Sequence, residues 1–564
     1  MELRYPIRSR VQELLISMFS ILLAPLAALA EDDTTQSYIS GTATNVGQIV
    51  VGDTGTNNFL VISNATRVLT STGTVGVATS ANFNNALLTG PGTFWTNTQW
   101  FVVGSNGSFN TLVVSNGARL VTGQTNQNVQ TMIGRGPLGS NNTVIVTGTN
   151  TAWIVRNLNL RMGLDTGGGN QLLISDGAQV VVGGGSVILG DGAVSSPSGG
   201  RNIVTISGSN SLLLAGSLIS VGRFSPNNQV VVTNGGRLVS AGATIGVTNP
   251  SETNNSVIVT GAGSVWDSSG DIRIQRAHNM LLIEDGGSVS APTNLLGIAF
   301  NTGTRNNMVR ITDGSLAVTN AAGTGFYDII RGSNVLNGGT LTVDSVRMTN
   351  SVNSLFLFHG GTFNTKNSTF SNVALFVVGN GTSSATLNLQ GGSHQFFNGL
   401  QINTNATLKG TGTLEANTTV IGKLSPGASP GLLTITGNLT LASNAVFEVE
   451  LDGTTPGTLY DQVDVTGTVN ISNSILTLDV SFSPTTNDLF TIIVNDGSDA
   501  VLGTFQGLTE NAFIDASSPG VDAFFRISYI GGTGNDVVLT ATIPEPSALL
   551  LFGAGLLVLA LRRK

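Results

Sequence analysis

The sequence predicts an all-β fold, a β-solenoid in which short strands stack coil upon coil, and three observations lead to it. Glycine supplies 73 of the 564 residues, about 13% against an average near 7%. Only 10% of the residues are charged while 40% are apolar, which excludes general disorder. A short phrase of Asn followed by apolar residues returns every 24 to 32 residues, a period typical of a repeat array.

Each copy of this phrase has an Asn, four or five mainly apolar or β-branched residues and then a turn. Copies begin at Asn58, Asn110, Asn142, Asn170, Asn228, Asn255 and Asn307. Turns such as Asn116-Gly117 alternate with Gly-rich turns that lead to Trp95, Trp153 and Trp266. Three short strands per coil, bounded by Gly, Asn or Asp, exclude a helical repeat because no 3.6-residue apolar stripe survives. The Asn residues either form an internal hydrogen-bonded ladder or simply follow a turn preference.

These phrases resemble the repeats of autotransporter-passenger-like proteins, and the resemblance covers residues 58–343. It implies a right-handed parallel β-helix of roughly 24–32 residues per coil, exposed at the cell surface. We expect the repeat region over 31–345 and degenerate coils over 346–407. The segment 408–543 resembles the C-terminal part of the same families, which continues and caps the helix. A cap is needed because an open solenoid end exposes strand edges.

The N-terminus has the three parts of a secretory signal peptide. Arg4, Arg8 and Arg10 precede an apolar run, which ends in a small-residue cleavage site at Ala28 and Ala30. Residues 1–30 are therefore expected to be removed from an exported chain, the alternative being an uncleaved anchor. The chain has no cysteine, so disulfides, thiolate metal sites and cysteine nucleophiles are excluded.

The C-terminal 21 residues, 544–564, have a different tripartite arrangement. In order, they are the motif Pro544, Glu545 and Pro546, a charge-free apolar run over 548–561, and a basic end that includes Arg562 and Arg563. This arrangement resembles the PEP-CTERM sorting signal of Gram-negative bacteria. The resemblance implies processing by exosortase, a membrane transpeptidase, during delivery to the cell surface or extracellular matrix. We expect the apolar run to be a short transmembrane helix that anchors the chain in the inner membrane before processing; a plain tail anchor is the alternative.

Removing both terminal segments makes the chain more acidic. Of the 24 basic and 32 acidic residues, six and three lie in these segments, so the mature net charge is −11. An acidic surface repels phosphate backbones, and the linear sequence has no basic patch interleaved with aromatic residues. Nucleic acid is therefore not an expected partner.

Right-handed β-helices also include polysaccharide lyases, so the polar clusters need to be considered. Asp267, Asp271, Arg273 and Arg276 lie within ten residues. They could supply Ca²⁺ ligands and a proton acceptor, or form an ion-paired outer face. The coils vary little in length, which leaves no long loops to build a cleft.

Other candidate groups are weaker still. Glu448, Glu450 and Asp452 alternate with apolar residues, so they either bridge Ca²⁺ or form a solvated face. One GGxGxD phrase at 531–536 matches a calcium repeat that normally needs tandem copies. The three Trp residues named above could stack on sugars, but their shared repeat position favours packing between coils.

The ionisable residues therefore predict neither a catalytic site nor a metal site. The histidines His278, His359 and His394 lie far apart without metal-ligand spacing, and no cofactor is expected beyond a weak case for Ca²⁺. We interpret the chain as an exported, non-enzymatic structural or adhesive protein of the cell surface or extracellular matrix, including biofilm. Its expected partners are exosortase, the export machinery and extracellular polysaccharide or neighbouring surface proteins. The alternative is a polysaccharide lyase or glycoside hydrolase on the same fold.

Overall fold

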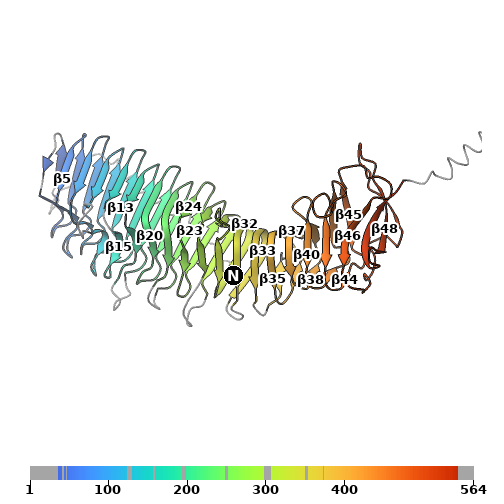
Figure 1. The fold of residues 1–564 in the computed structure, drawn as a ribbon. Coiled ribbons are helices and arrows are strands. Elements are labelled where there is room, and N and C mark those ends of the chain that lie inside the picture. The colour runs from blue at the N-terminus through green and yellow to red at the C-terminus, as the bar shows by residue number, and fades with distance from the viewer. Residues whose placement is uncertain are drawn as a thin grey trace, which may run out of the picture.

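The computed structural model describes residues 36–40, 44–45, 47–123, 130–156, 159–192, 199–247, 252–297, 306–349, 354–371 and 374–543. These residues form 49 strands and no helix, stacked as a β-solenoid of about 16 turns. The predicted all-β solenoid is confirmed. Figure 1 shows an elongated, bowed rod in which the chain advances steadily from one end to the other.

The coils of the N-terminal half contain three strand positions, as the sequence predicted. The first position holds β1 (Gln36–Ser40), β4 (Phe59–Ser63), β7 (Asn85–Thr89), β10 (Thr111–Ser115), β13 (Thr143–Thr147), β16 (Gln171–Ser175), β19 (Ile203–Ser207), β21 (Gln229–Thr233), β23 (Ser256–Thr260), β26 (Met280–Glu284) and β29 (Met308–Thr312). The second holds β2 (Thr44–Asn45), β5 (Arg67–Thr70), β8 (Phe94–Asn97), β11 (Arg119–Thr122), β14 (Ala152–Val155), β17 (Gln179–Val182), β20 (Leu212–Val221), β22 (Arg237–Ile245), β24 (Val265–Ser268), β27 (Ser288–Ser290) and β30 (Ser315–Val318). The third holds β3 (Gln48–Val51), β6 (Thr72–Val75), β9 (Phe101–Val103), β12 (Thr131–Arg135), β15 (Asn159–Leu164), β18 (Ser186–Leu189), β25 (Ile272–Ile274), β28 (Asn294–Gly297) and β31 (Phe326–Ile329), while β20 and β22 run on into this position.

Parallel pairing continues through the later strands, and the end of the solenoid is closed differently. These strands are β32 (Gly332–Met348), β33 (Ser354–Phe370), β34 (Phe376–Val378), β35 (Ala385–Phe396), β36 (Leu400–Ile402), β37 (Ala406–Glu415), β38 (Thr418–Val420), β39 (Lys423–Pro426), β40 (Leu432–Ile435), β41 (Leu439–Leu441), β42 (Val446–Leu451), β43 (Gln462–Val465), β44 (Val469–Asn470), β45 (Ile475–Val480), β46 (Leu489–Asn495), β47 (Phe513–Asp515), β48 (Phe524–Gly531) and β49 (Asp536–Ala541). Strands β46, β49, β48 and β47 pair antiparallel in that order and form the C-terminal cap. Some later coils are shorter than the predicted 24–32 residues, since Thr407 pairs with Lys423 only 16 residues further on.

One continuous core fills the solenoid because alternate residues of each strand point inward. In β13, Val144 and Val146 are fully buried, while Thr143, Ile145 and Thr147 are partly exposed. The tryptophans Trp95, Trp153 and Trp266 are also fully buried, so the predicted packing between coils is confirmed. Each of these indole N–H groups donates to a hydroxyl of the preceding coil, at 3.0 to 3.2 Å, which satisfies the polar edge of the ring.

The recurrent Asn residues form the internal ladder that was one of the two interpretations of the repeat. Its rungs are Asn58, Asn84, Asn110, Asn142, Asn170, Asn202, Asn228, Asn255, Asn279 and Asn307. The side-chain oxygen of Asn142 accepts hydrogen bonds from the backbone N–H of Asn110 at 2.9 Å and from its side-chain amide at 3.0 Å. Each rung thereby fixes the corner of the preceding coil. The buried Asn side chains obtain hydrogen-bond partners in the same way.

A glycine at the end of the third strand makes room for the ladder. Gly104 has φ +75, and a Cβ there would lie 2.0 Å from the Nδ2 of Asn142. Gly76 relates to Asn110 in the same way, with a Cβ 2.2 Å from the amide. The left-handed backbone and the missing Cβ are therefore both needed, and this pairing of Gly with Asn accounts for part of the glycine excess.

Candidate functional site

The C-terminal tail emerges directly from the cap. Strand β49 ends at Ala541, and the backbone N–H of Thr542 donates to the carbonyl of Phe524 on β48 at 2.8 Å. The next residue, Ile543, is 67% exposed, so the chain has reached the surface when the Pro-Glu-Pro motif begins. The motif, the apolar run and the basic end lie outside the described residues, as do Ala28 and Ala30.

Comparison with known proteins decides the nature of this tail. The protein-family model described as the PEP-CTERM protein-sorting motif matches residues 542–564. The chain ends in a PEP-CTERM motif. The motif indicates an exported protein that exosortase processes on its way to the envelope or surface of a Gram-negative bacterium. No curated protein matches the chain in sequence.

A membrane helix was predicted over 548–561. The structure contains no helix long and apolar enough to cross a membrane within the residues it describes, and the predicted segment lies outside them. Inner-membrane anchoring before processing stays a prediction.

The predicted cluster is not one site: Asp267 belongs to one ion pair and Asp271 and Arg273 to another, while the backbone carbonyl of Arg276 accepts a hydrogen bond from Asn307. Asp267 pairs with Arg237 of the preceding coil at 2.7 Å, and both side chains are well exposed. Asp271 pairs with Arg273 at 3.0 Å and accepts hydrogen bonds from Thr293 and Asn294 at 2.9 Å. Burial opposes ionisation of Asp271, but these hydrogen bonds outweigh it and lower its pKa. The cluster therefore matches the ion-paired outer face that was one of its two interpretations.

Glu448 and Asp452 have side-chain partners, whereas one buried oxygen of the Glu450 carboxyl has no hydrogen-bond partner among the described residues. Glu448 contacts the ammonium of Lys423 at 2.7 Å and accepts from Ser425 at 2.9 Å. Burial works against the charge of Glu448, yet the lysine contact prevails and holds its pKa below the usual value. Side chains from Glu448 and Glu450 alternate with buried Phe447 and Val449, so the predicted outward orientation is confirmed. The described residues contain no group of three acidic or His side chains positioned for a metal ion.

Asp461, between β42 and β43, was not singled out by sequence, although its carboxyl is strongly perturbed. It is fully buried and accepts from the backbone N–H of Gly431 at 2.7 Å and of Glu450 at 2.9 Å. Burial raises the pKa of Asp461 to about 7; the two hydrogen bonds oppose this shift, and the charges of Glu450 and Asp452 add to it. The carboxyl joins the corner around Gly431 to β42.

The predicted calcium phrase at 531–536 is a hairpin turn between β48 and β49. Asp536 accepts from the backbone N–H of Asn495 at 2.9 Å and of Thr533 at 3.2 Å. The side-chain amide of Asn535 donates to the carbonyls of Asp496 and Asp499. These groups hold the turn against the neighbouring coil, which gives the phrase a structural role.

His394 and Ser368 form a contact of the kind that nucleophilic catalysis uses. The Nδ1 of His394 lies 2.9 Å from the Oγ of Ser368, and its Nε2 lies 2.8 Å from the carbonyl of Gly391. Because a carbonyl can only accept, Nε2 carries the proton and Nδ1 accepts from the serine. Both side chains are buried, and burial lowers the pKa of His394 to about 4, against the opposing effect of the Gly391 bond. A substrate has no access to this pair, so it belongs to the core.

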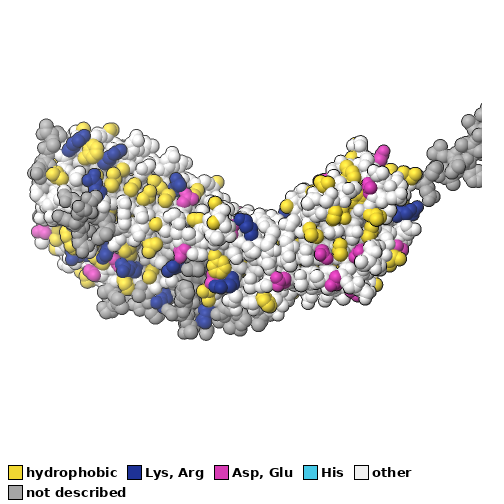
Figure 2. Space-filling view, in the orientation of Figure 1, with side chains coloured by type: hydrophobic (Ala, Val, Ile, Leu, Met, Phe, Trp, Pro, Cys, Tyr) yellow, Lys and Arg dark blue, Asp and Glu magenta, His cyan; other side chains and the backbone are white. Residues whose placement is uncertain are grey.

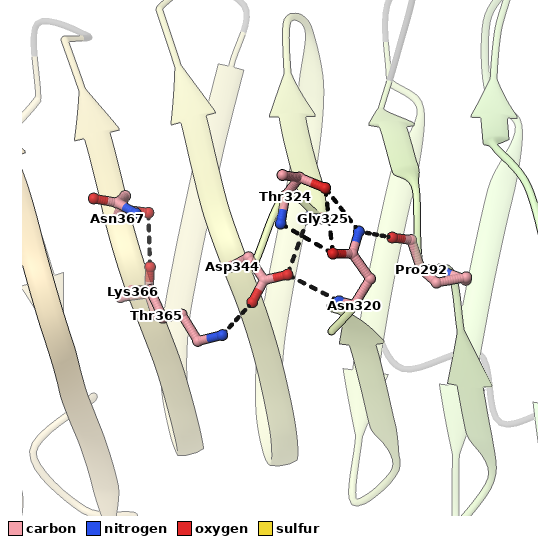
Figure 3. Close-up of polar contacts among 8 residues, drawn as sticks. All are labelled: Pro292, Asn320, Thr324, Gly325, Asp344, Thr365, Lys366 and Asn367. Carbon is pink, nitrogen blue, oxygen red and sulfur yellow. Dashed lines mark hydrogen bonds and ion pairs between the residues drawn. The ribbon is translucent and has the colours of Figure 1, made fainter. Parts of the chain in front are cut away.

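Asp344 is the centre of a polar network that sequence did not predict. Figure 3 shows its carboxylate between Asn320 and Lys366, which belong to different coils. It accepts from the backbone N–H of Asn320 at 2.9 Å and of Gly325 at 3.0 Å, and pairs with the Lys366 ammonium at 2.7 Å. Burial disfavours the charge, but these donors outweigh it and lower the pKa of Asp344. The network ties the corner 320–325 to β32 and β33.

Charge is distributed unequally along the rod. Residues 54–164 contain five arginines and no acidic residue, whereas 424–543 contain 13 acidic residues and one basic residue, Arg526. Figure 2 shows this difference on one face, with blue side chains scattered over the N-terminal part and magenta ones prevailing near the C-terminal end. Counting charges segment by segment reveals this difference from the sequence alone. The net charge of −11 for residues 31–543 does not show it.

The register also brings basic and aromatic residues together that are distant in sequence. Arg67 of β5 and Arg119 of β11 both pair in register with Phe94 of β8. A basic patch interleaved with an aromatic ring therefore exists on the surface, although none is visible in the linear sequence.

Proposed function

We propose that the mature protein is a stiff, non-enzymatic structural or adhesive rod of the cell surface or extracellular matrix. The observation that carries the proposal is the uninterrupted solenoid, whose single core runs from Ile49 to Ala541 and whose capped end leads straight into the sorting motif. Parallel ladders give stiffness because every coil is hydrogen-bonded to its neighbours. A long repetitive surface suits weak contacts that act many at a time.

Two hollows on the described surface support this interpretation over the enzyme alternative. One, of about 480 Å³, lies among the first coils and includes Asp53 as its only ionisable residue. The other, of about 550 Å³, crosses three turns and contains no acidic residue. Neither brings together the two carboxylates that glycoside hydrolysis needs.

Fractionation of cells with mass mapping of the mature termini tests the proposal. We expect cleavage after Ala30, a processed C-terminus and a surface or matrix location. Deleting residues 544–564 should abolish the C-terminal processing and the surface or matrix location. Deleting the gene should weaken cell–cell or cell–surface adhesion. Turnover of an acidic or neutral polysaccharide by the mature protein, lost in Asp267→Ala or Asp271→Ala, would establish the lyase or hydrolase alternative instead.

A further inference from the structure

We propose that Arg67, Phe94 and Arg119 form a binding subsite for an extended, carboxylate-bearing polysaccharide. The inference rests on the adhesive role proposed above and names the ligand class and the residues that contact it. The three residues occupy the same outward position on successive coils, in strands β5, β8 and β11.

Among the residues that the structure describes, no acidic side chain neutralises the two arginines of this subsite. The guanidinium carbon of Arg67 lies 4.9 Å from the centre of the Phe94 ring, a cation–π contact that holds the arginine in place. Both arginines are exposed. Among the described residues neither one has an acidic partner, because 54–164 contains none and no ion pair reaches them from elsewhere.

A shallow groove continues from this subsite across the adjoining turns. The 550 Å³ hollow is lined by Phe94, Arg119 and the turns at 91–92, 116–117 and 148–150. These turns belong to three successive coils, so the groove follows the long axis of the rod. An open groove along three coils fits a chain that extends beyond it, not an enclosed small molecule.

The chemistry of the groove selects a carboxylated sugar chain. A guanidinium presents paired N–H donors that match the two oxygens of a carboxylate. The phenyl ring offers an apolar surface to the C–H groups of a pyranose, and turn residues such as Asn116 and Thr149 offer hydrogen bonds to its hydroxyls. Arg67 and Arg119 lie two strand spacings apart, about 10 Å, so one chain carrying several carboxylates can reach both.

The acidic cap of a second copy is the competing occupant, since 13 acidic residues lie in 424–543. The uronate chain is favoured because the groove follows three successive coils along the rod and includes the aromatic ring of Phe94 beside Arg119. Because the cap also exposes apolar side chains such as Phe513, self-association is measured as a separate outcome.

Binding of defined oligogalacturonates to the purified mature protein, measured by calorimetry at two salt concentrations, tests the inference. Methyl-esterified oligomers supply the same sugars without charge, and poly-glutamate supplies charge without sugars. Arg237→Gln is the matched control, because Arg237 occupies the same column but is paired with Asp267.

We expect Arg67→Gln/Arg119→Gln to weaken oligogalacturonate binding at least about tenfold and to reduce its salt dependence, while Arg237→Gln changes it less than about twofold. Phe94→Leu should weaken oligogalacturonate binding and leave any poly-glutamate binding unchanged.

Absence of oligogalacturonate binding, or an equal loss in Arg237→Gln, would overturn the inference. Self-association that disappears in the double variant, without sugar binding, would assign the site to the cap of a second copy. If cells expressing the double variant adhere normally, only this inference fails; if the wild-type protein contributes nothing to adhesion, the proposed function fails.

Discussion

The coils before residue 312 and the region after residue 424 fix their corners by partly different means. In the first region a neutral Asn of the next coil, such as Asn142, accepts the corner N–H. In the second region Asn438 still accepts from the N–H of Thr468, but single carboxylates are added: Asp461 accepts from Gly431 and Glu450, and Asp536 from Asn495 and Thr533. A neutral Asn can repeat in every coil because stacked Asn residues add no charge. A single carboxylate instead suits a corner whose geometry occurs only once.

The largest expected effect is the loss of one rung of the ladder. Asn142→Ala leaves the buried N–H and side-chain amide of Asn110 without their acceptor, while the backbone N–H of residue 142 still donates to the side-chain oxygen of Asn170. Each buried unsatisfied group costs about 1–3 kcal/mol, so we expect the two groups together to destabilise these coils by about 2–6 kcal/mol. Hydrogen exchange resolved by peptide measures it around β10, β13 and β16.

Asn388→Ala is the control for this rung. Asn388 donates to Asn364 at 2.8 Å on the partly exposed outer face, where water replaces a lost bond. We expect less than about 1 kcal/mol. Equal effects of the two substitutions would show that the buried ladder is not what secures the N-terminal coils.

The second prediction concerns the glycine that accommodates the ladder. Gly104→Ala forces a Cβ against Asn142 in addition to the cost of a left-handed backbone, and we expect about 2–3 kcal/mol. In an Asn142→Ala background the collision is gone, so the added cost should fall to about 1–2 kcal/mol. A double-mutant cycle measures this coupling by chemical denaturation.

Gly381 separates the two contributions to this cost. It has φ +84, and no atom lies within 4 Å of the place that a Cβ would take, so Gly381→Ala should show only the backbone cost. Strict additivity in the cycle at Gly104 and Asn142 would contradict the proposed steric dependence.

The third prediction is that two parts of the rod respond to pH in opposite directions. The pKa of Asp461 rises from 3.8 to about 7 on folding, so its contribution is complete below pH 3.8 and is lost as pH rises through 7. The pKa of His394 falls from 6.5 to about 4, so its contribution is complete above pH 6.5 and is lost as pH falls through 4.

Peptide-resolved hydrogen exchange between pH 4 and 7, corrected for intrinsic rates, distinguishes the two. Strand β43 should lose protection as pH rises, and β35 should lose it as pH falls. Asp461→Asn and His394→Gln should each flatten the profile of their own region alone. Parallel profiles in both regions would contradict the assignment.

The contrast between the repeated Asn ladder and the irregularly placed carboxylates also explains which features the sequence predicts. The coil length, the three strands, the buried Trp residues and the ladder position all follow from a phrase that repeats with small variation. Asp344 and Asp461 have donors 11 to 30 residues away at irregular spacings, so no local pattern marks them as structural. Arg67, Phe94 and Arg119 become neighbours only through the register, which depends on the unequal lengths of the intervening turns.

The smallest expected effect concerns the exposed ion pairs of the N-terminal coils. Arg237 and Asp267 approach within 2.7 Å, but their side chains are 58% and 38% exposed, so solvent screens the attraction. Arg237→Gln should therefore cost less than about 1 kcal/mol, and less at high salt. Lys366→Met makes the contrast, because the carboxylate of Asp344 is fully buried and losing its cationic partner should cost about 3 kcal/mol. Thermal melts of both variants at low and high salt measure the difference. A larger loss of stability for Arg237→Gln would mean that the exposed ion pairs stabilise the rod more than the buried carboxylate of Asp344 and its partners do.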